Sequence, residues 1–305
     1  MKIAIVGIGG VGGYYGGKLA REYENSPEHE IIFIARGNHL AAIRDNGLQL
    51  YTQEGDYITR PRLATDNPTP AVIFDLVFFC VKSYHLETSA LMLKANITRN
   101  TVVLPLLNGV NISDRLHQSL PDADIIKGLV YISSLVDKPG VVRQLGGSCK
   151  LVFGTDDVSV NRYQYILDIL IKAKIDATLT DKISEAQWTK YLMICPLGSL
   201  TAATGKTFGQ IIGDTNMKAR LREMIEEVKA IASARKIELP ADVVDKTIEV
   251  ISHFPYDTKT SMQIDREHGN PTEIDIFTDY IRQSGLELGI PTPLHDKIYN
   301  QLLSF

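Results

Sequence analysis

Three glycines near the start of the chain have the spacing of a dinucleotide-binding loop. They form a G-x-G-x-x-G pattern directly after the apolar run from Ile3 to Val6. In this pattern the first glycine permits a tight turn, the second admits a pyrophosphate, and the third lets the next helix pack closely. The helix N-terminus offers N–H groups to the phosphates. A glycine-rich turn without a ligand is the alternative. The expected cofactor contacts are Gly7, Ile8, Gly9, Gly10, Val11 and Gly12.

The residue after the second predicted strand indicates which nicotinamide cofactor is used. The apolar run from Ile31 to Ala35 is followed by Arg36, where an NAD-binding unit usually has Asp or Glu. A guanidinium group suits a 2′-phosphate, and no carboxylate is present to repel one. This position favours NADPH over NADH, with a solvated loop cation as the alternative interpretation of Arg36.

Two further predicted strands end in polar residues that could contact a ligand. The apolar run from Asp75 to Val81 is followed by Lys82, and the run from Thr101 to Leu107 is followed by Asn108. Ligands bind at the carboxyl ends of the strands in open α/β sheets. We therefore interpret Lys82 and Asn108 as cofactor or substrate contacts beside the glycine loop.

Composition narrows the class of protein. The 305 residues are 44% hydrophobic and 22% charged, with a net charge of −4, which is ordinary for a soluble protein of two domains. The charge and the lack of basic runs argue against nucleic-acid binding. No apolar run reaches membrane-spanning length. Three widely separated cysteines form no metal or disulfide pattern, and we expect a cytoplasmic protein.

The pattern of elements predicts an α/β protein with two parts. Residues 1–181 are expected to form a Rossmann-type dinucleotide-binding domain, with a small antiparallel extension at 48–65 and short antiparallel strands at 124–154. Residues 182–305 show mainly helical periodicity and are expected to form an all-helical domain. Its predicted helices include one at 184–200, interrupted by Pro196, one from Asp214 to about Lys236, and one that begins near Pro271.

Seven short motifs give the chain a resemblance to the ketopantoate reductase (2-dehydropantoate 2-reductase) family. They extend nearly from end to end, and other dinucleotide-binding families share the glycines but not the rest. The family fold is a Rossmann domain and a helical C-terminal domain with the active site in the cleft. The motifs are GIGGVGG with Arg36, VKSY (81–84), LLNGV (106–110), WTKY (188–191), TSM (260–262), PTEID (271–275) and GIPTP (289–293).

The resemblance implies an activity and assigns residues to it. The family reduces a 2-oxo acid, ketopantoate, to a 2-hydroxy acid with NADPH, in pantothenate and coenzyme A biosynthesis. By motif, Lys190 matches the catalytic lysine and Glu273 its acidic partner. On pattern alone, these two residues would be a solvated helix lysine and a helix first-turn acid. The other matches are Asn108 in the cleft, Lys82 near the cofactor, Ser261 at the substrate and Asp265 near that serine.

The chemistry of ketone reduction explains why these residue types would be needed. Hydride addition builds negative charge on the carbonyl oxygen, and a group that is both cationic and a proton donor stabilises that charge and completes the alcohol. A lysine such as Lys190 does both if its pKa is lowered toward neutrality. The Asn108 amide can orient the carbonyl, and Ser261 can hold the substrate carboxylate.

The chain departs from the family pattern four and eight residues after Lys190. The family has asparagines there that line the substrate pocket, whereas this chain has Ile194 and Gly198. Loss of these polar groups favours a less polar 2-oxo acid or a different mode of ketopantoate binding. A non-catalytic NADPH-binding regulatory protein and a nucleotide-binding module without hydride chemistry are further alternatives. A homodimer is also possible, because the apolar stripes of the C-terminal helices could form either a core or an interface.

The Arg36 interpretation predicts a selective loss of NADPH affinity. Arg36→Ala should raise the Kd for NADPH by on the order of tenfold or more, since a charge-assisted contact to the 2′-phosphate is lost. The Kd for NADH should change little, because NADH lacks that phosphate. Titration of both cofactors measures the two values, and an equal change in both would contradict the assignment.

Overall fold

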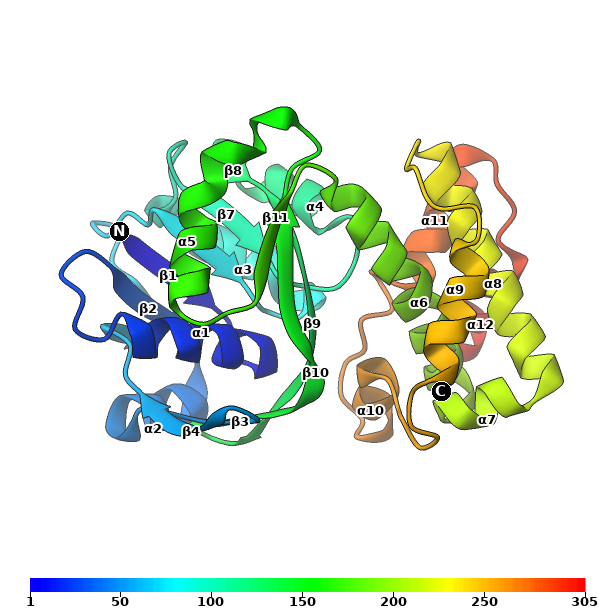
Figure 1. Cartoon of the computed structure of the whole chain (residues 1–305), viewed down its shortest axis with the longest axis horizontal. Helices are drawn as coiled ribbons and strands as arrows, with labels where there is room; N and C mark the ends of the chain where they lie inside the picture. The colour runs from blue at the N-terminus through cyan, green and yellow to red at the C-terminus, as the bar shows by residue number, and fades with distance from the viewer. Residues whose placement is uncertain (305) are drawn as a thin grey trace. The chain divides into compact units, whose positions relative to one another are not determined.

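The chain divides into two compact units, each with its own secondary structure. The computed structural model describes residues 1–304 (Figure 1). The units are Met1–Ile183, which is α/β, and Ser184–Phe305, whose described residues contain helices and no strand. The expected fold class, a Rossmann-type domain followed by a helical domain, is confirmed.

The first unit contains an all-parallel sheet of six strands. Their spatial order is β5-β2-β1-β6-β7-β8, which is 3-2-1-4-5-6 when these strands are counted along the chain. This is the strand order of a doubly wound dinucleotide-binding fold, and it reverses direction between β1 and β6. Strands buried on both faces need continuous apolar runs, which this chain has. The strands are β1 (Lys2–Val6), β2 (Glu30–Ile34), β5 (Leu63–Thr65), β6 (Leu76–Phe79), β7 (Val102–Pro105) and β8 (Asp124–Ile125).

A second, mixed sheet is built on one long hairpin. Its strands are β9 (Lys127–Lys138) and β10 (Val141–Gly154), antiparallel to each other with three register shifts. β10 also pairs in parallel with β3 (Leu48–Thr52) and β11 (Ala177–Thr180), and β4 (Gly55–Thr59) pairs antiparallel to β3. The expectation of short strands at 124–154 was wrong. β9 and β10 are long, because the glycines here lie at bulges and do not end the strands. The extension at 48–65 stops at Thr59, since β5 joins the parallel sheet.

Helix α1 (Gly10–Glu22) lies between the two sheets. A Cβ added at Gly16 would lie 3.1 Å from Ile5 of the parallel sheet, and one at Gly13 would lie 2.5 Å from Val142 of the mixed sheet. The missing side chains therefore let both sheets approach the helix. The remaining helices of this unit are α2 (Gly37–Asn46), α3 (Leu86–Met92), α4 (Ile112–Ser119) and α5 (Gln164–Lys172), with short 3₁₀ turns at Ser83–His85, Lys94–Asn96 and Val158–Tyr163.

Four helices of the second unit pack against the helix predicted after Asp214, which carries an apolar stripe. Leu221, Met224 and Val228 of this helix are fully buried, and Asp214 caps it by accepting from two backbone N–H groups. The first helix of the unit, α6, begins at the last residue of the first unit. The helices are α6 (Ile183–Thr204), α7 (Phe208–Gly213), α8 (Thr215–Ala234), α9 (Val243–Ser252), α10 (Ser261–Glu267), α11 (Thr278–Leu288) and α12 (Pro293–Leu303).

Two expectations about this unit were wrong. Pro196 does not interrupt the first helix, because α6 continues through it to Thr204. No helix begins near Pro271, where a turn leads into α11 at Thr278. Proline suits the first turn of a helix, but it suits extended segments and turns equally well. The expected end of α11 is confirmed, since Gly289 follows it in the left-handed conformation with φ 68°.

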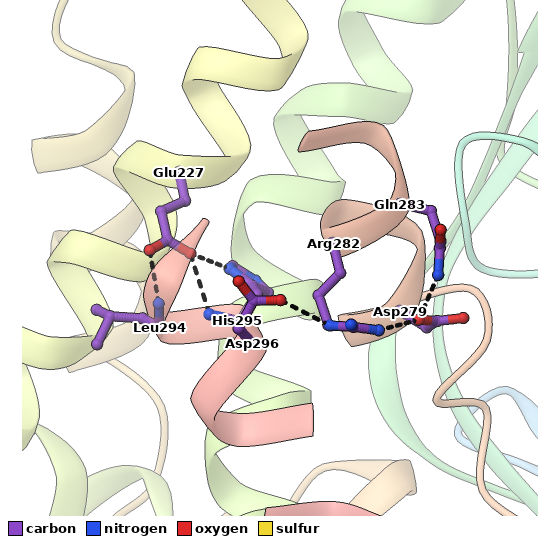
Figure 2. Close-up of polar contacts among 7 residues, drawn as sticks. All are labelled: Glu227, Asp279, Arg282, Gln283, Leu294, His295 and Asp296. Carbon is purple, nitrogen blue, oxygen red and sulfur yellow. Dashed lines mark hydrogen bonds and ion pairs between the residues drawn. The ribbon is translucent and has the colours of Figure 1, made fainter. Parts of the chain in front are cut away.

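A largely buried carboxylate joins α8 to the N-terminus of α12 (Figure 2). Glu227 accepts hydrogen bonds from the backbone N–H of Leu294 at 2.8 Å and of His295 at 3.1 Å, and from His295 Nδ1 at 2.6 Å. The His295 side chain is fully buried. Thr292, the N-cap residue of α12, makes no side-chain capping bond, so Glu227 satisfies N–H groups that the helix itself leaves unpaired. Figure 2 also shows the Arg282 guanidinium between Asp279 and Asp296.

Removal of the Glu227 carboxylate should destabilise the helical unit. Glu227→Ala leaves buried donors unpaired and should lower the free energy of unfolding by about 3 kcal/mol. Asp296→Ala, which removes a half-exposed partner of Arg282, should cost less than about 1 kcal/mol. Urea unfolding followed by the fluorescence of Trp188, the only tryptophan and part of α6, measures both. Equal losses for the two variants would contradict this interpretation.

Candidate functional site

The glycine loop has the geometry that its pattern predicts. Gly7 follows β1 with φ +90°, and its N–H donates to the Ile34 carbonyl at 2.9 Å. A Cβ at Gly12 would lie 2.0 Å from the Gly7 carbonyl oxygen, so only glycine permits this packing of α1 on the turn. A Cβ at Gly9 would meet no atom within 4 Å. The backbone at Gly9 therefore faces open space, at the N-terminus of α1.

The other predicted cofactor residues of the first unit lie at the same edge of the parallel sheet. Arg36 follows β2 and is the exposed N-cap residue of α2, Lys82 follows β6, and Asn108 follows β7. Because β2, β1, β6 and β7 are consecutive and parallel, their carboxyl ends meet on one side. The structure thus brings Arg36, Lys82 and Asn108 to the edge that carries the glycine loop, around the point where the strand order reverses.

This edge fits a dinucleotide. The open space at Gly9 and the first-turn N–H groups of α1 can accommodate a pyrophosphate, and Arg36 supplies an exposed cation. Ser134 of β9 adds a hydroxyl group that no sequence pattern indicated. Its Oγ would lie 2.9 Å from a Cβ at Gly10, and it is a buried atom that bonds to none of the described residues. Such an orphaned group beside the loop suits a polar ligand atom.

In the second unit, one face of α6 carries three of the predicted residues. Lys190, Ile194 and Gly198 are spaced four apart, which aligns them along one side of a helix. Lys190 and Ile194 are partly buried. A Cβ at Gly198 would meet no atom within 4 Å, so open space lies above this glycine. The row therefore presents the ammonium group of Lys190, the apolar side chain of Ile194 and, at Gly198, no side chain.

Glu273 acts electrostatically on Lys190. The Glu273 side chain is buried, with 5% of its surface exposed, in the irregular segment before α11. Burial lowers the pKa of the Lys190 ammonium group from its ordinary 10.5 to about 8, and the charge of Glu273 opposes part of that shift. Lys190 therefore exists in both protonation states close to neutral pH, which is the property expected of a proton donor in a reaction.

Ser261 is held near the third position of the α6 row. It is the exposed first residue of α10, whose N-cap residue is Thr260. The Thr260 hydroxyl hydrogen-bonds to that of Thr201 at 2.7 Å, and Thr201 donates to the Gly198 carbonyl at 3.2 Å. These bonds fix the N-terminus of α10 beside Gly198. Asp265 lies further along α10 and is partly buried.

The predicted residues thus form two groups, one in each unit. Gly7–Gly12, Arg36, Lys82 and Asn108 share a sheet edge, and the row on α6 has Glu273 and Ser261 for neighbours. Within residues 1–304, no cluster of three or more His, Cys, Asp or Glu side chains is arranged to hold a metal ion. None of the helices in that range has the length and hydropathy needed to cross a bilayer.

Comparison with known proteins relates both units to the family that the sequence motifs resemble. A family model described as "Ketopantoate reductase PanE/ApbA" matches residues 3–157, and one described as "Ketopantoate reductase PanE/ApbA C terminal" matches residues 182–304. The chain is 27% identical over 318 residues to 2-dehydropantoate 2-reductase of Mesorhizobium japonicum, with 98% of this chain and 95% of that protein covered. It is 25% identical over 305 residues to the uncharacterized oxidoreductase YkpB of Bacillus subtilis, with 99% and 98% covered.

A solved structure extends the similarity to the fold. The crystal structure of the PanE/ApbA family ketopantoate reductase from Ralstonia eutropha JMP134 is 32% identical in sequence and superposes with a TM-score of 0.89. The match covers 100% of this chain and 98% of that chain. The resemblance noted in the sequence motifs is therefore confirmed over the whole length.

Two glycine variants should separate cofactor binding from folding. Gly9→Ala adds a methyl group into open space, so it should leave the melting temperature nearly unchanged and raise the Kd for NADPH about tenfold or more. Gly12→Ala drives a methyl group against the Gly7 carbonyl and should destabilise the protein by about 1–3 kcal/mol. Thermal unfolding and cofactor titration measure the two effects. Unchanged NADPH affinity in Gly9→Ala would contradict the predicted pyrophosphate position.

Proposed function

The chain belongs to the ketopantoate reductase family of NADPH-dependent oxidoreductases, and we propose that it reduces a 2-oxo acid to the 2-hydroxy acid. Ketopantoate is the substrate we propose first, because 2-dehydropantoate 2-reductase is the activity named for a relative that matches over nearly the whole chain. With this substrate, the reaction would belong to pantothenate biosynthesis. The observation that carries the proposal is a lysine with a pKa of about 8 beside a buried glutamate, on the helix that matches the family motif.

The first unit holds the cofactor in this proposal. The turn at Gly7–Gly12 and the N-terminus of α1 receive the pyrophosphate, and Arg36 binds the 2′-phosphate of NADPH. Lys82 adds a cation at the end of β6, the strand beside β1. When bound, NADPH supplies the hydride. The residues of the sheet edge hold and orient it.

The second unit supplies the proton and binds the substrate. As negative charge develops on the ketone oxygen, the Lys190 ammonium group stabilises it and then donates a proton from Nζ, which completes the hydroxyl group. Glu273 keeps Lys190 protonated to a higher pH than burial alone would allow. Ser261 can hydrogen-bond to the substrate carboxylate, and Asn108, a residue of the first unit, can donate its amide hydrogen to the carbonyl.

A less polar 2-oxo acid is the second candidate substrate. Ile194 and Gly198 stand four and eight residues after Lys190, where the family pattern has polar asparagines. Ile194 offers no hydrogen bond to a substrate hydroxyl, and the space above Gly198 admits an extra substituent. If this candidate is correct, kcat/KM for an unhydroxylated 2-oxo acid with a branched side chain should equal or exceed that for ketopantoate.

A spectrophotometric assay of NADPH oxidation tests both the reaction and its proton donor. The protein should oxidise NADPH in the presence of ketopantoate or another member of a panel of 2-oxo acids, with kcat falling as the pH rises through about 8. The sign follows from the mechanism, since only protonated Lys190 can donate. Lys190→Ala should lower kcat by on the order of 100-fold.

Titration with NADPH, NADH and ATP beside this assay distinguishes the non-catalytic alternatives. Tight NADPH binding with no turnover of any 2-oxo acid would contradict the reductase proposal and favour a regulatory NADPH-binding protein. Binding of ATP without either nicotinamide cofactor would favour a nucleotide-binding module. Full activity of Lys190→Ala would leave the reaction intact and remove Lys190 as the acid.

A further inference from the structure

A second row of side chains on α6 anchors the helix to the elements around it. Tyr191, Cys195 and Ser199 are spaced four apart, directly next to the row of Lys190, and none exposes more than 1% of its surface. The Tyr191 hydroxyl donates to the Ile276 carbonyl at 2.6 Å, with the Phe277 carbonyl at 3.3 Å. The Ser199 hydroxyl shares a 2.6 Å hydrogen bond with the Thr278 hydroxyl.

The carbonyls that Tyr191 contacts belong to the segment that carries Glu273. This segment lies between the end of α10 at Glu267 and the start of α11 at Thr278, so no helix determines its path. Glu273 is three residues before Ile276 and five before Thr278. Two hydrogen bonds from α6 therefore hold the segment just after Glu273, against the helix that carries Lys190.

We propose that Tyr191 is a positioning residue, whose hydrogen bond to the Ile276 carbonyl sets the placement of the Glu273 carboxylate relative to the Lys190 ammonium group. Tyr191 follows Lys190 in the chain, so any displacement of this turn of α6 moves both side chains together. Its ring also contacts Trp188, Phe277 and Tyr280, with centroids 5.6–6.2 Å away, which leaves the hydroxyl little freedom. This inference rests on the proposed role of Lys190 as proton donor.

The position of the Glu273 carboxylate affects the pKa of Lys190, which can be measured. Burial holds the pKa of Tyr191 well above its usual range, with Cys195, Tyr280 and Asp275 acting in the same direction, so its hydroxyl stays protonated and donates throughout the working range. Burial lowers the pKa of Lys190, and Glu273 is the charged side chain that opposes this. If the carboxylate recedes, the pKa of Lys190 should fall further.

The pH dependence of kcat in Tyr191→Phe tests the proposal. The variant keeps the ring and loses the hydrogen bond, so the alkaline limb of the kcat profile should move to lower pH by about half a unit, as for an ion pair lengthened by roughly 1 Å. At neutral pH, kcat should fall by less than about twofold, and above the limb by about threefold, with KM nearly unchanged. Ser199→Ala, which removes the bond to Thr278, should shift the limb in the same direction and serves as the second variant should Tyr191→Phe not fold.

A matched control distinguishes positioning from a general loss of stability. Tyr23 is also a buried tyrosine whose hydroxyl donates to a backbone carbonyl, that of Ile169 at 3.1 Å in the first unit. Tyr23→Phe should lower the melting temperature about as much as Tyr191→Phe and leave the pH profile unchanged. A shift of the profile in both variants would overturn the proposal.

A double-mutant comparison shows whether Tyr191 acts through Glu273. In a Glu273→Gln background the carboxylate charge is gone, so Tyr191→Phe should add no further shift of the alkaline limb. An equal shift in both backgrounds, or none in either, would overturn the proposal. If Lys190→Ala keeps full activity, the proposed proton donor fails. If Lys190→Ala is inactive and the Tyr191→Phe profile matches the parent, only the positioning role fails.

Discussion

Partial burial of the Lys190 ammonium group beside the Glu273 carboxylate is the constraint on which the proposed chemistry of the helical unit depends. Burial alone would favour the neutral amine, and a carboxylate too near would keep the lysine charged far above neutral pH. The pKa of about 8 is a balance between these effects, and it depends on the position of Glu273. Glu273 lies in an irregular segment before α11, and a hydrogen bond from α6 holds this segment three residues later, at Ile276.

Contacts from the buried row of α6 connect this helix to several elements of its unit. Its buried row bonds to the start of α11 through Tyr191 and Ser199, and Cys195 Sγ lies 3.8 Å from His295 Nε2 on α12. His295 is in turn bonded to Glu227 of α8. Pro196 within α6 removes one backbone donor, and the surrounding contacts keep the helix continuous in spite of it.

The sequence predicted the first unit well where short-range signals and topology agree. Buried parallel strands are continuous apolar runs, and the residue after each run lies at the carboxyl edge, so the positions of Arg36, Lys82 and Asn108 followed from the pattern. The long hairpin β9–β10 was missed, because a glycine at a bulge and a glycine at a turn look alike in sequence. Ser134 carries no local signal, and only the structure places it beside Gly10.

In the second unit the motifs indicated the candidate residues but not the contacts around them. The pattern WTKY identified Lys190 by resemblance, whereas nothing in it indicated that the next residue, Tyr191, bonds to a carbonyl 85 positions later. Pro271 and Glu273 suggested a helix start, since both residue types favour one. The structure has an irregular segment there that leads into a turn, and hydrogen bonds from α6 reach it at Ile276 and at Thr278, the first residue of α11.

The two adjacent rows of α6 allow substrate preference and catalytic geometry to change independently. The buried row of Tyr191, Cys195 and Ser199 makes the contacts that hold the helix and the Glu273 segment. Ile194 and Gly198 belong to the other row, and a Cβ added at Gly198 would meet open space. Replacement of polar by apolar groups in that row therefore changes what lies next to Lys190 without loosening Glu273. Under the proposed reaction, a different 2-oxo acid can therefore be accepted through changes on one face of α6 while Lys190 and Glu273 stay in place.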